Sequence, residues 1–247
     1  MRKAWFVAAA MFFGVVSYAT PGFATPSTQI WIPSTDIQPF GVVHLGVDNY
    51  NTVGKKAEDG GRMFPTTYGL TVGVVPSEIW GVEVGIDMFE ASDYPFAFNA
   101  KVGLSEGAFG DWSPAIALGG YGFGTEKDAT DYNIVYGLVA KTFGSFGRLS
   151  IGGYSGNDKL LLDKNGEKDN TGLLASWDKQ LSDKFWAAVD YQGGSNSWSA
   201  VSFGVSYALS DNASFIVGYD IFLEKDLNND GVDDNYDTMT FQLDVNF

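Results

Sequence analysis

The sequence predicts an all-β fold, a transmembrane antiparallel up-and-down β-barrel of about twelve strands, with ten to fourteen as the range. Apolar and polar residues alternate along stretches of about ten residues, which is the length that a tilted strand needs to cross a bilayer. Long polar connections alternate with short turns, and the chain ends inside an alternating stretch. A barrel with long loops at one end and short turns at the other produces this arrangement.

The first residues have the features of a secretory leader. Arg2 and Lys3 precede a short apolar run, and small residues follow it up to Ala24. The run from Ala4 to Tyr18 is about 15 residues long, whereas a membrane-spanning helix needs roughly 20. We therefore predict a cleaved signal peptide over residues 1–24, with a retained membrane anchor as the alternative.

Residues 25–39 are interrupted by prolines and show no period, so we predict a periplasmic segment or a plug in the barrel mouth. The barrel itself is predicted over residues 40–247. The chain contains no cysteine, which excludes both a disulfide scaffold and a lipidated N-terminal cysteine. The barrel must therefore be stable without covalent cross-links.

The strongest predicted strands have one apolar face and one small or polar face. In the stretch 80–89, Val84 and Ile86 share one face, and Glu83 and Asp87 share the other. The stretches near Ala115, Val135, Leu149 and Leu174 alternate poorly, so the strand count is given as a range. The clearest predicted strands span residues 66–75, 80–89, 96–104, 185–192, 199–209 and 214–223.

The last strand carries apolar residues at every second position, with a terminal aromatic residue: Phe241, Leu243, Val245 and Phe247. With the leader, the even strand count and the unequal connections, this ending resembles the bacterial outer-membrane β-barrel proteins. The resemblance covers nearly the whole chain. It implies insertion in the lipid of a Gram-negative outer membrane, and it implies that the barrel-assembly machinery recognises these four residues as an assembly signal.

A soluble β-sandwich also alternates and is the main alternative fold. Acidic residues and glycines share one face on most strands, however, which is unlike a sandwich core. Aromatic residues also gather near strand ends, as expected at membrane interfaces. These residues are Trp80, Tyr94, Trp112, Phe123, Phe143, Phe146, Trp186, Trp198 and Phe247.

If the apolar face meets lipid, the lumen is acidic. Inward positions then hold His44 and two sets of charged residues, the acids Asp48, Glu83, Asp87, Asp178, Asp190, Asp220 and Asp244, and the bases Lys101 and Lys141. Carboxylates that line a pore favour cations. We predict a narrow passive channel for cations or small polar solutes, and the alternative is a closed barrel whose surface loops bind a partner.

Other function classes fit less well. The chain has 15 basic against 30 acidic residues, which excludes nucleic acid as a natural partner. His44 is the single histidine, and no serine beside it in sequence completes a hydrolase site, so we predict no enzymatic activity. The sequence carries no signal for an oligomeric state.

One loop has the spacing of a calcium site, with Asp226, Asn228, Asp230, Gly231, Asp234 and Asp237 at positions 1, 3, 5, 6, 9 and 12. It resembles the loops of EF-hand, dockerin and thrombospondin-type repeats. We predict that these side-chain oxygens and the carbonyl of Val232 bind Ca²⁺, with Gly231 allowing the sharp turn. A solvated acidic turn is the alternative, because Asp237 replaces the usual bidentate glutamate.

Overall fold

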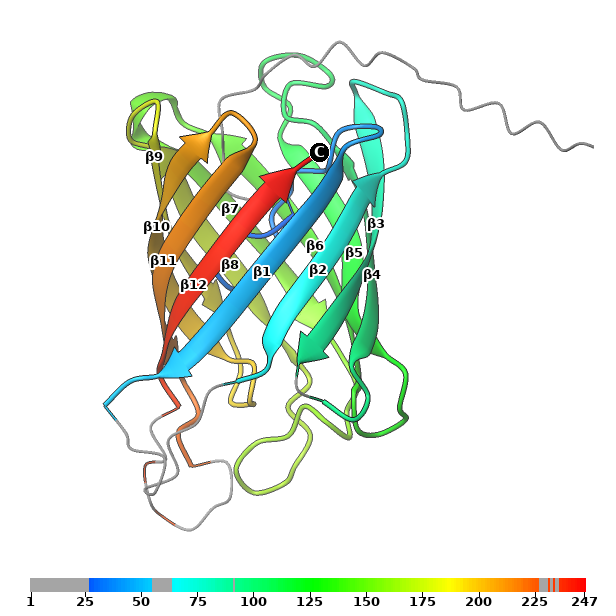
Figure 1. Cartoon of the computed structure of the whole chain (residues 1–247), viewed down its shortest axis with the longest axis vertical. Helices are drawn as coiled ribbons and strands as arrows, with labels where there is room; N and C mark the ends of the chain where they lie inside the picture. The colour runs from blue at the N-terminus through cyan, green and yellow to red at the C-terminus, as the bar shows by residue number, and fades with distance from the viewer. Residues whose placement is uncertain (1–26, 55–63, 91, 227–230, 232, 234–235) are drawn as a thin grey trace, which may run out of the picture.

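The computed structural model describes residues 27–54, 64–90, 92–226, 231, 233 and 236–247. Twelve antiparallel strands pair in sequence order, and β12 pairs with β1, so the sheet closes into a barrel (Figure 1). The predicted fold class and the predicted strand count are both confirmed. The strands are β1 Val43–Thr52, β2 Thr66–Gly73, β3 Trp80–Glu90, β4 Phe96–Leu104, β5 Ala115–Gly124, β6 Asp131–Thr142, β7 Arg148–Ser155, β8 Thr171–Gln180, β9 Phe185–Gln192, β10 Ala200–Ser210, β11 Ala213–Phe222 and β12 Thr238–Asn246.

Closure of the sheet leaves no unpaired strand edge, which satisfies the backbone hydrogen bonds that a lipid environment cannot satisfy. The seam between β1 and β12 runs from the pair His44 and Asn246 to the pair Thr52 and Thr238. Outside the strands, Gly144–Phe146 forms a single 3-10 turn. Among the described residues, no helix has the length and apolarity to cross a membrane.

The two ends of the barrel differ. We call the end with the short hairpin connections and Phe247 the turn end, and the opposite end the loop end (Figure 1). The connections at the loop end include residues 53–65, 156–170 and 223–237. Leu243 of β12 and Phe247, which follows this strand, are 36% and 72% exposed, while Asp244 between them is buried. The role of this strand in assembly stays a prediction.

The strands that alternate poorly in sequence do so for a structural reason. On β6, Val135 and Val139 point outward, yet the inward positions between them are also apolar. The inward residues of this side form one buried cluster, Ile32, Ile134, Tyr136, Leu138, Tyr154, Leu161 and Leu174. Both faces of β6 are therefore apolar, the inward face in the buried cluster and the outward face on the exterior. For this reason the sequence of β6 does not alternate between apolar and polar residues.

Ile32 in that cluster does not belong to the barrel wall. Residues 27–40 enter the lumen and form a small hairpin, in which Thr28 and Pro33 bridge and the Gln29 amide donates to the Ile32 carbonyl at 2.8 Å. Ile30 and Ile32 are 2% and 0% exposed. We call residues 27–40 the lumenal segment. It contacts the wall on β7, β8, β9 and β12 and also on β3 and β4, and a hollow remains beside it.

Candidate functional site: the lumen and the lumenal segment

The inner wall carries most of its charge on the strands that surround the lumenal segment. Asp190 of β9 is 1% exposed, and its Oδ2 atom accepts backbone hydrogen bonds from Ile30 at 2.8 Å, Trp31 at 2.9 Å and Ile32 at 3.4 Å. One carboxylate thus binds the tip of the hairpin through consecutive amides. Such charge-assisted hydrogen bonds are stronger than neutral ones.

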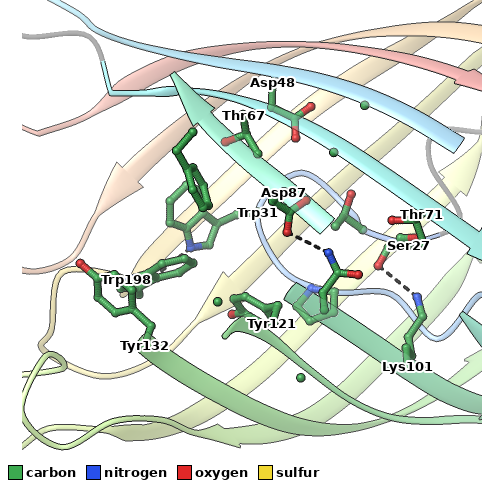
Figure 2. A pocket seen from close by; sticks show the side chains of 18 of the residues that line it. Ser27, Trp31, Asp48, Thr67, Thr71, Asp87, Lys101, Tyr121, Tyr132 and Trp198 are labelled. Atoms are coloured by element: carbon green, nitrogen blue, oxygen red, sulfur yellow. Dashed lines mark hydrogen bonds between the residues drawn. The ribbon is translucent and has the colours of Figure 1, made fainter. Parts of the chain in front are cut away.

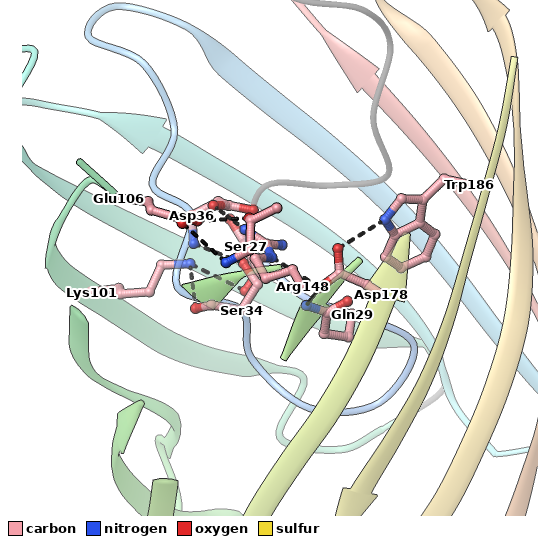
Figure 3. Close-up of polar contacts among 10 residues, drawn as sticks. Ser27, Gln29, Ser34, Asp36, Lys101, Glu106, Arg148, Asp178 and Trp186 are labelled. Atoms are coloured by element: carbon pink, nitrogen blue, oxygen red, sulfur yellow. Dashed lines mark hydrogen bonds and ion pairs between the residues drawn. The ribbon is translucent and has the colours of Figure 1, made fainter. Parts of the chain in front are cut away.

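A second anchor lies nearer the turn end, on β7 and β8. The Arg148 guanidinium contacts Asp178 at 2.9 Å and Asp36 of the lumenal segment at 2.6 Å (Figure 3). Asp178 also accepts hydrogen bonds from the Gln29 amide group at 3.1 Å and from the Trp186 indole at 3.3 Å. Arg148 therefore links an acid of the wall to an acid of the segment.

A third anchor is the ion pair between Glu83 of β3 and Lys101 of β4, with 3.1 Å between Oε1 and Nζ. The Lys101 ammonium also donates to the carbonyl of Ser27 at 3.2 Å (Figure 3). The backbone N–H of Gln38 donates to the Glu83 carboxylate at 2.7 Å. Both side chains are nearly fully buried. The pair thus holds the beginning and the end of the lumenal segment against the same wall.

The predicted lumenal residues His44, Asp220 and Asp244 also face inward. His44 Nε2 lies 3.5 Å from Asp244 Oδ1, and His44 Nδ1 lies 2.9 Å from the side-chain oxygen of Asn246. Asp220 accepts a hydrogen bond from the Thr238 hydroxyl at 2.8 Å, and both side chains are fully buried.

The surroundings of His44 do not form a nucleophilic triad in the described residues. The Ser214 hydroxyl donates to the Asp244 carboxylate at 3.4 Å, so it bonds to the acid and not to the imidazole. Nucleophilic activation requires the hydroxyl to contact the base. This geometry gives His44 a polar lining role.

A hollow of about 430 Å³ runs along the lumen beside the lumenal segment. Asp48 of β1 and Asp87 of β3 project into it, and Trp31 and Trp198 meet in its wall (Figure 2). Asp87 accepts a hydrogen bond from Asn99 at 2.8 Å. Within the described chain, no hydrogen bond or ion pair to the Asp48 carboxylate is found.

A second, smaller hollow of about 210 Å³ lies at the turn end and is lined by residues that include Thr35, Gln38 and Glu106. Glu83 lines the larger hollow and Gln38 lines the smaller one. Because the Gln38 amide bonds to Glu83, their contact lies between the two hollows. The lumenal segment therefore separates the interior into two compartments.

Several sequence-based assignments need correction. Trp186 is 5% exposed and lies in the lumen, and Trp198 packs against Trp31, Tyr121 and Tyr132, so neither belongs to an aromatic girdle. Trp186 projects inward because it occupies an inward position of β9. Trp198 projects inward from the loop between β9 and β10.

Lys141 also differs from its predicted lumenal position. It follows buried Ala140 on β6 and pairs with Glu106 at 2.9 Å at the turn end. The inward basic residue that the sequence analysis missed is Arg148. It lies two residues before the buried Ser150, so the period of two could have identified it.

The predicted calcium loop is only partly described. Asn228, Asp230, Val232 and Asp234 lie outside the described residues. Asp226 accepts a hydrogen bond from the Gly231 amide at 3.0 Å. Asp237 pairs with Lys225 at 3.0 Å and accepts the Phe222 amide at 3.0 Å, so its carboxylate already has two donors. Calcium binding stays a prediction.

These observations define the class by its fold: a closed twelve-stranded barrel with charged residues in its interior, which is the fold of an outer-membrane porin. In particular, the chain is similar to the KdgM porin, with a TM-score of 0.51 and 7% identity over 83% of this chain and 98% of that chain. A structure of KdgM in complex with disordered oligogalacturonate gives a TM-score of 0.53, 8% identity and the same coverage. The NanC porin gives a TM-score of 0.47 and 11% identity over 82% of this chain and 98% of that chain.

The sequence matches no protein-family model and no curated protein. The similarity to the KdgM structures therefore lies in the fold, and it confirms the resemblance inferred from the leader, the strands and the ending. Which solute passes or binds must be argued from this chain's own lumen.

Proposed function

We propose that this protein is a channel of the outer membrane of a Gram-negative bacterium, through which small cations and small polar solutes diffuse passively. The proposal assigns no catalytic residue. It includes a leader at residues 1–24 that is removed during export, and contact of the outward apolar residues with lipid. The two KdgM structures support a porin-like function through their fold.

The charge of the inner wall is the observation that supports cations. Among the described inward-facing residues, the basic side chains Lys101 and Arg148 oppose a larger set of acids, Asp48, Glu83, Asp87, Asp178, Asp190, Asp220 and Asp244. Lys101 and Arg148 are engaged in ion pairs at 3.1 Å and 2.9 Å. The excess carboxylates give the pore a negative potential, which attracts cations and repels anions.

The path follows the two hollows. A solute from the loop end enters the larger hollow beside Asp48 and Asp87, and then meets the contact between Glu83 and Gln38. Passage to the smaller hollow requires that this contact opens. Because Gln38 belongs to the lumenal segment, a small displacement of residues 34–38 joins the compartments without any change in the barrel.

Conductance of the purified full-length protein in planar bilayers tests the proposal. We expect discrete channel openings in KCl, with brief closures as the contact between Glu83 and Gln38 forms and breaks. A barrel confirmed by heat-modifiable gel mobility that gives no conductance would contradict the proposal. A detergent blank and a boiled sample are the controls.

The lumenal segment also favours a second candidate, a closed barrel that presents its loops to a partner. Three anchor sites hold this segment, and Ile30 and Ile32 are almost fully buried. In that case the acidic lumen has a structural role, and the barrel conducts only when residues 27–40 are deleted. Conductance of the full chain separates the two candidates.

A further inference from the structure

The larger hollow combines acidic and aromatic side chains, a combination that simple passage of ions does not require. Its acidic side holds Asp48 of β1 and Asp87 of β3, two strands that are separated by β2. Its aromatic side holds side chains from the lumenal segment, the strands and the loop end, namely Trp31, Tyr50, Phe64, Phe89, Tyr121, Tyr132, Tyr136, Trp198 and Phe222. Tyr50 and Phe89 lie two residues beyond the acids on the same strands, and Trp31 contacts Tyr50, so the acidic and aromatic residues line one continuous hollow (Figure 2).

The Asp87 carboxylate is held by a hydrogen bond, and neither Asp48 nor Asp87 forms an ion pair with a lysine or arginine of the described chain, although His44 lines the same hollow. Gly69 of β2 pairs with Asp87, and a Cβ atom there would approach Asp87 Oδ1 to 2.9 Å, so the glycine makes room for this carboxylate against the wall. Asn99, a neutral group, is the hydrogen-bond donor to Asp87. Lys101, which lines the same hollow, is paired with Glu83.

The aromatic side is rigid because its rings pack on one another. The Trp31 indole donates to the Trp198 carbonyl at 3.0 Å, and its ring contacts Tyr50 and Phe222 edge to face, with centroids 5.5 Å and 5.4 Å apart. Trp198 in turn contacts Tyr121 at 5.6 Å. Rings held this way need no ordering when a ligand arrives, which reduces the entropic cost of binding.

We propose that this hollow is a binding site for a small organic cation with an alkylated ammonium group. The ring faces attract a cation by their quadrupole, most strongly for tryptophan, and the alkyl groups bury apolar surface against them. Asp48 and Asp87 supply the opposite charge. The inference names the solute class of the proposed channel and rests on that function only for the route by which the ligand arrives.

Other ligand classes use only half of this wall. A metal ion prefers oxygen ligands in a compact shell and gains little from aromatic rings. A neutral sugar stacks on rings and bonds to carboxylates, but it does not compensate their charge. An anionic sugar meets direct repulsion from Asp48 and Asp87. An alkylated ammonium ion is the ligand that uses the rings and the charge together.

Titration calorimetry of the full-length protein in detergent tests the site with choline and its uncharged isostere 3,3-dimethylbutan-1-ol. We expect choline to bind at least about tenfold more tightly, since cation–π and charge contributions of about 1.4 kcal/mol correspond to that factor. The double substitution Asp48→Asn and Asp87→Asn should remove this preference. Asp220→Asn removes the same charge from a lumenal residue outside the hollow and should leave choline affinity within about threefold.

Trp198→Leu tests the aromatic side and should weaken choline binding by about tenfold while the barrel keeps its heat-modifiable mobility. Equal binding of choline and the alcohol would overturn the proposal, as would binding of glucose or maltose without binding of choline. The channel function fails separately. A protein that conducts ions without binding choline loses only this inference, and a protein that binds choline without conducting loses only the proposed function.

Discussion

Asp190→Ala should release the tip of the lumenal segment while the barrel stays intact. The Asp190 carboxylate accepts the amides of Ile30 and Trp31 at 2.8 Å and 2.9 Å, and Ile30 is 2% exposed. Each buried amide left without an acceptor costs about 1 to 3 kcal/mol, so the two strong bonds represent about 2 to 6 kcal/mol. Removal of a buried carboxylate recovers part of this cost.

We take about 3 kcal/mol as the net loss for the docked segment, which corresponds to roughly a hundredfold change in its opening equilibrium. Hydrogen exchange measured by mass spectrometry on a peptide covering residues 27–33 reports this opening directly. The protection of these amides should fall about a hundredfold in Asp190→Ala. Asp190→Asn keeps one acceptor oxygen, so its loss should be nearer tenfold.

Asp220→Ala is the matched control, because Asp220 is also a buried lumenal acid but bonds to Thr238 of the wall. Its protection pattern in residues 27–33 should equal that of the parent. If Asp190→Ala leaves the protection of Ile30 and Trp31 unchanged, the carboxylate does not hold the segment and the anchoring argument is wrong. Loss of protection throughout the strands would show instead that the barrel itself had opened.

Three further predictions concern the segment, the turn end and the acidic loop. In the cysteine-free chain, Ile37→Cys with Gly81→Cys should form a disulfide, because a Cβ at Gly81 would lie 3.2 Å from the Ile37 Cβ. A shift of a few tenths of an ångström brings this distance to the roughly 3.5 to 4.5 Å of natural bridges. Oxidation should reduce conductance and dithiothreitol should restore it, whereas equal currents in both states would show that the segment need not move. At the turn end, Glu106 is partly buried, which opposes ionisation, but hydrogen bonds from Lys141 and Thr142 outweigh this and lower its pKa. Ionised Glu106 therefore stabilises the fold above its unfolded pKa near 4.5, and this contribution is lost as the pH falls through the lower folded pKa. The melting temperature of Glu106→Gln should therefore fall less steeply between about pH 5 and pH 3 than that of the parent. An unchanged slope would refute this assignment. In the loop before β12, millimolar calcium should slow proteolysis and Asp230→Ala should abolish the protection, while calorimetry without a binding signal would leave a solvated acidic turn.

The strands and the orientation of their side chains could be predicted from the sequence because a period of two fixes both. Glu83 and Asp87 alternate with apolar residues along their strand, so we predicted them to face the lumen, and the structure has them there. The same alternation places Trp186 on the inward face of β9, four residues before Asp190. The sequence analysis nevertheless assigned Trp186 to an aromatic girdle. On β6, apolar residues on both faces hid the alternation, since Leu138 packs inside the barrel while Val139 faces outward.

The lumenal segment could not be predicted in the same way. Residues 27–40 have no period, and their position depends on partners far away in sequence, such as Asp190, which is 160 residues from Ile30. A proline-broken segment next to an acidic lumen is compatible with many positions until those contacts are known. The pairing of Arg148 with both Asp36 and Asp178 is equally invisible in the local sequence.

The reversal potential of the purified full-length protein under a KCl gradient tests the central claim, an acidic lumen that conducts cations, most directly. We expect the sign of a potassium-selective pore at neutral pH, because the inward carboxylates outnumber Lys101 and Arg148. Asp48→Asn with Asp87→Asn should move the potential toward zero, while Glu106→Gln, at the turn end, should move it less. A potential of the opposite sign, or one that the double variant does not change, would contradict the account.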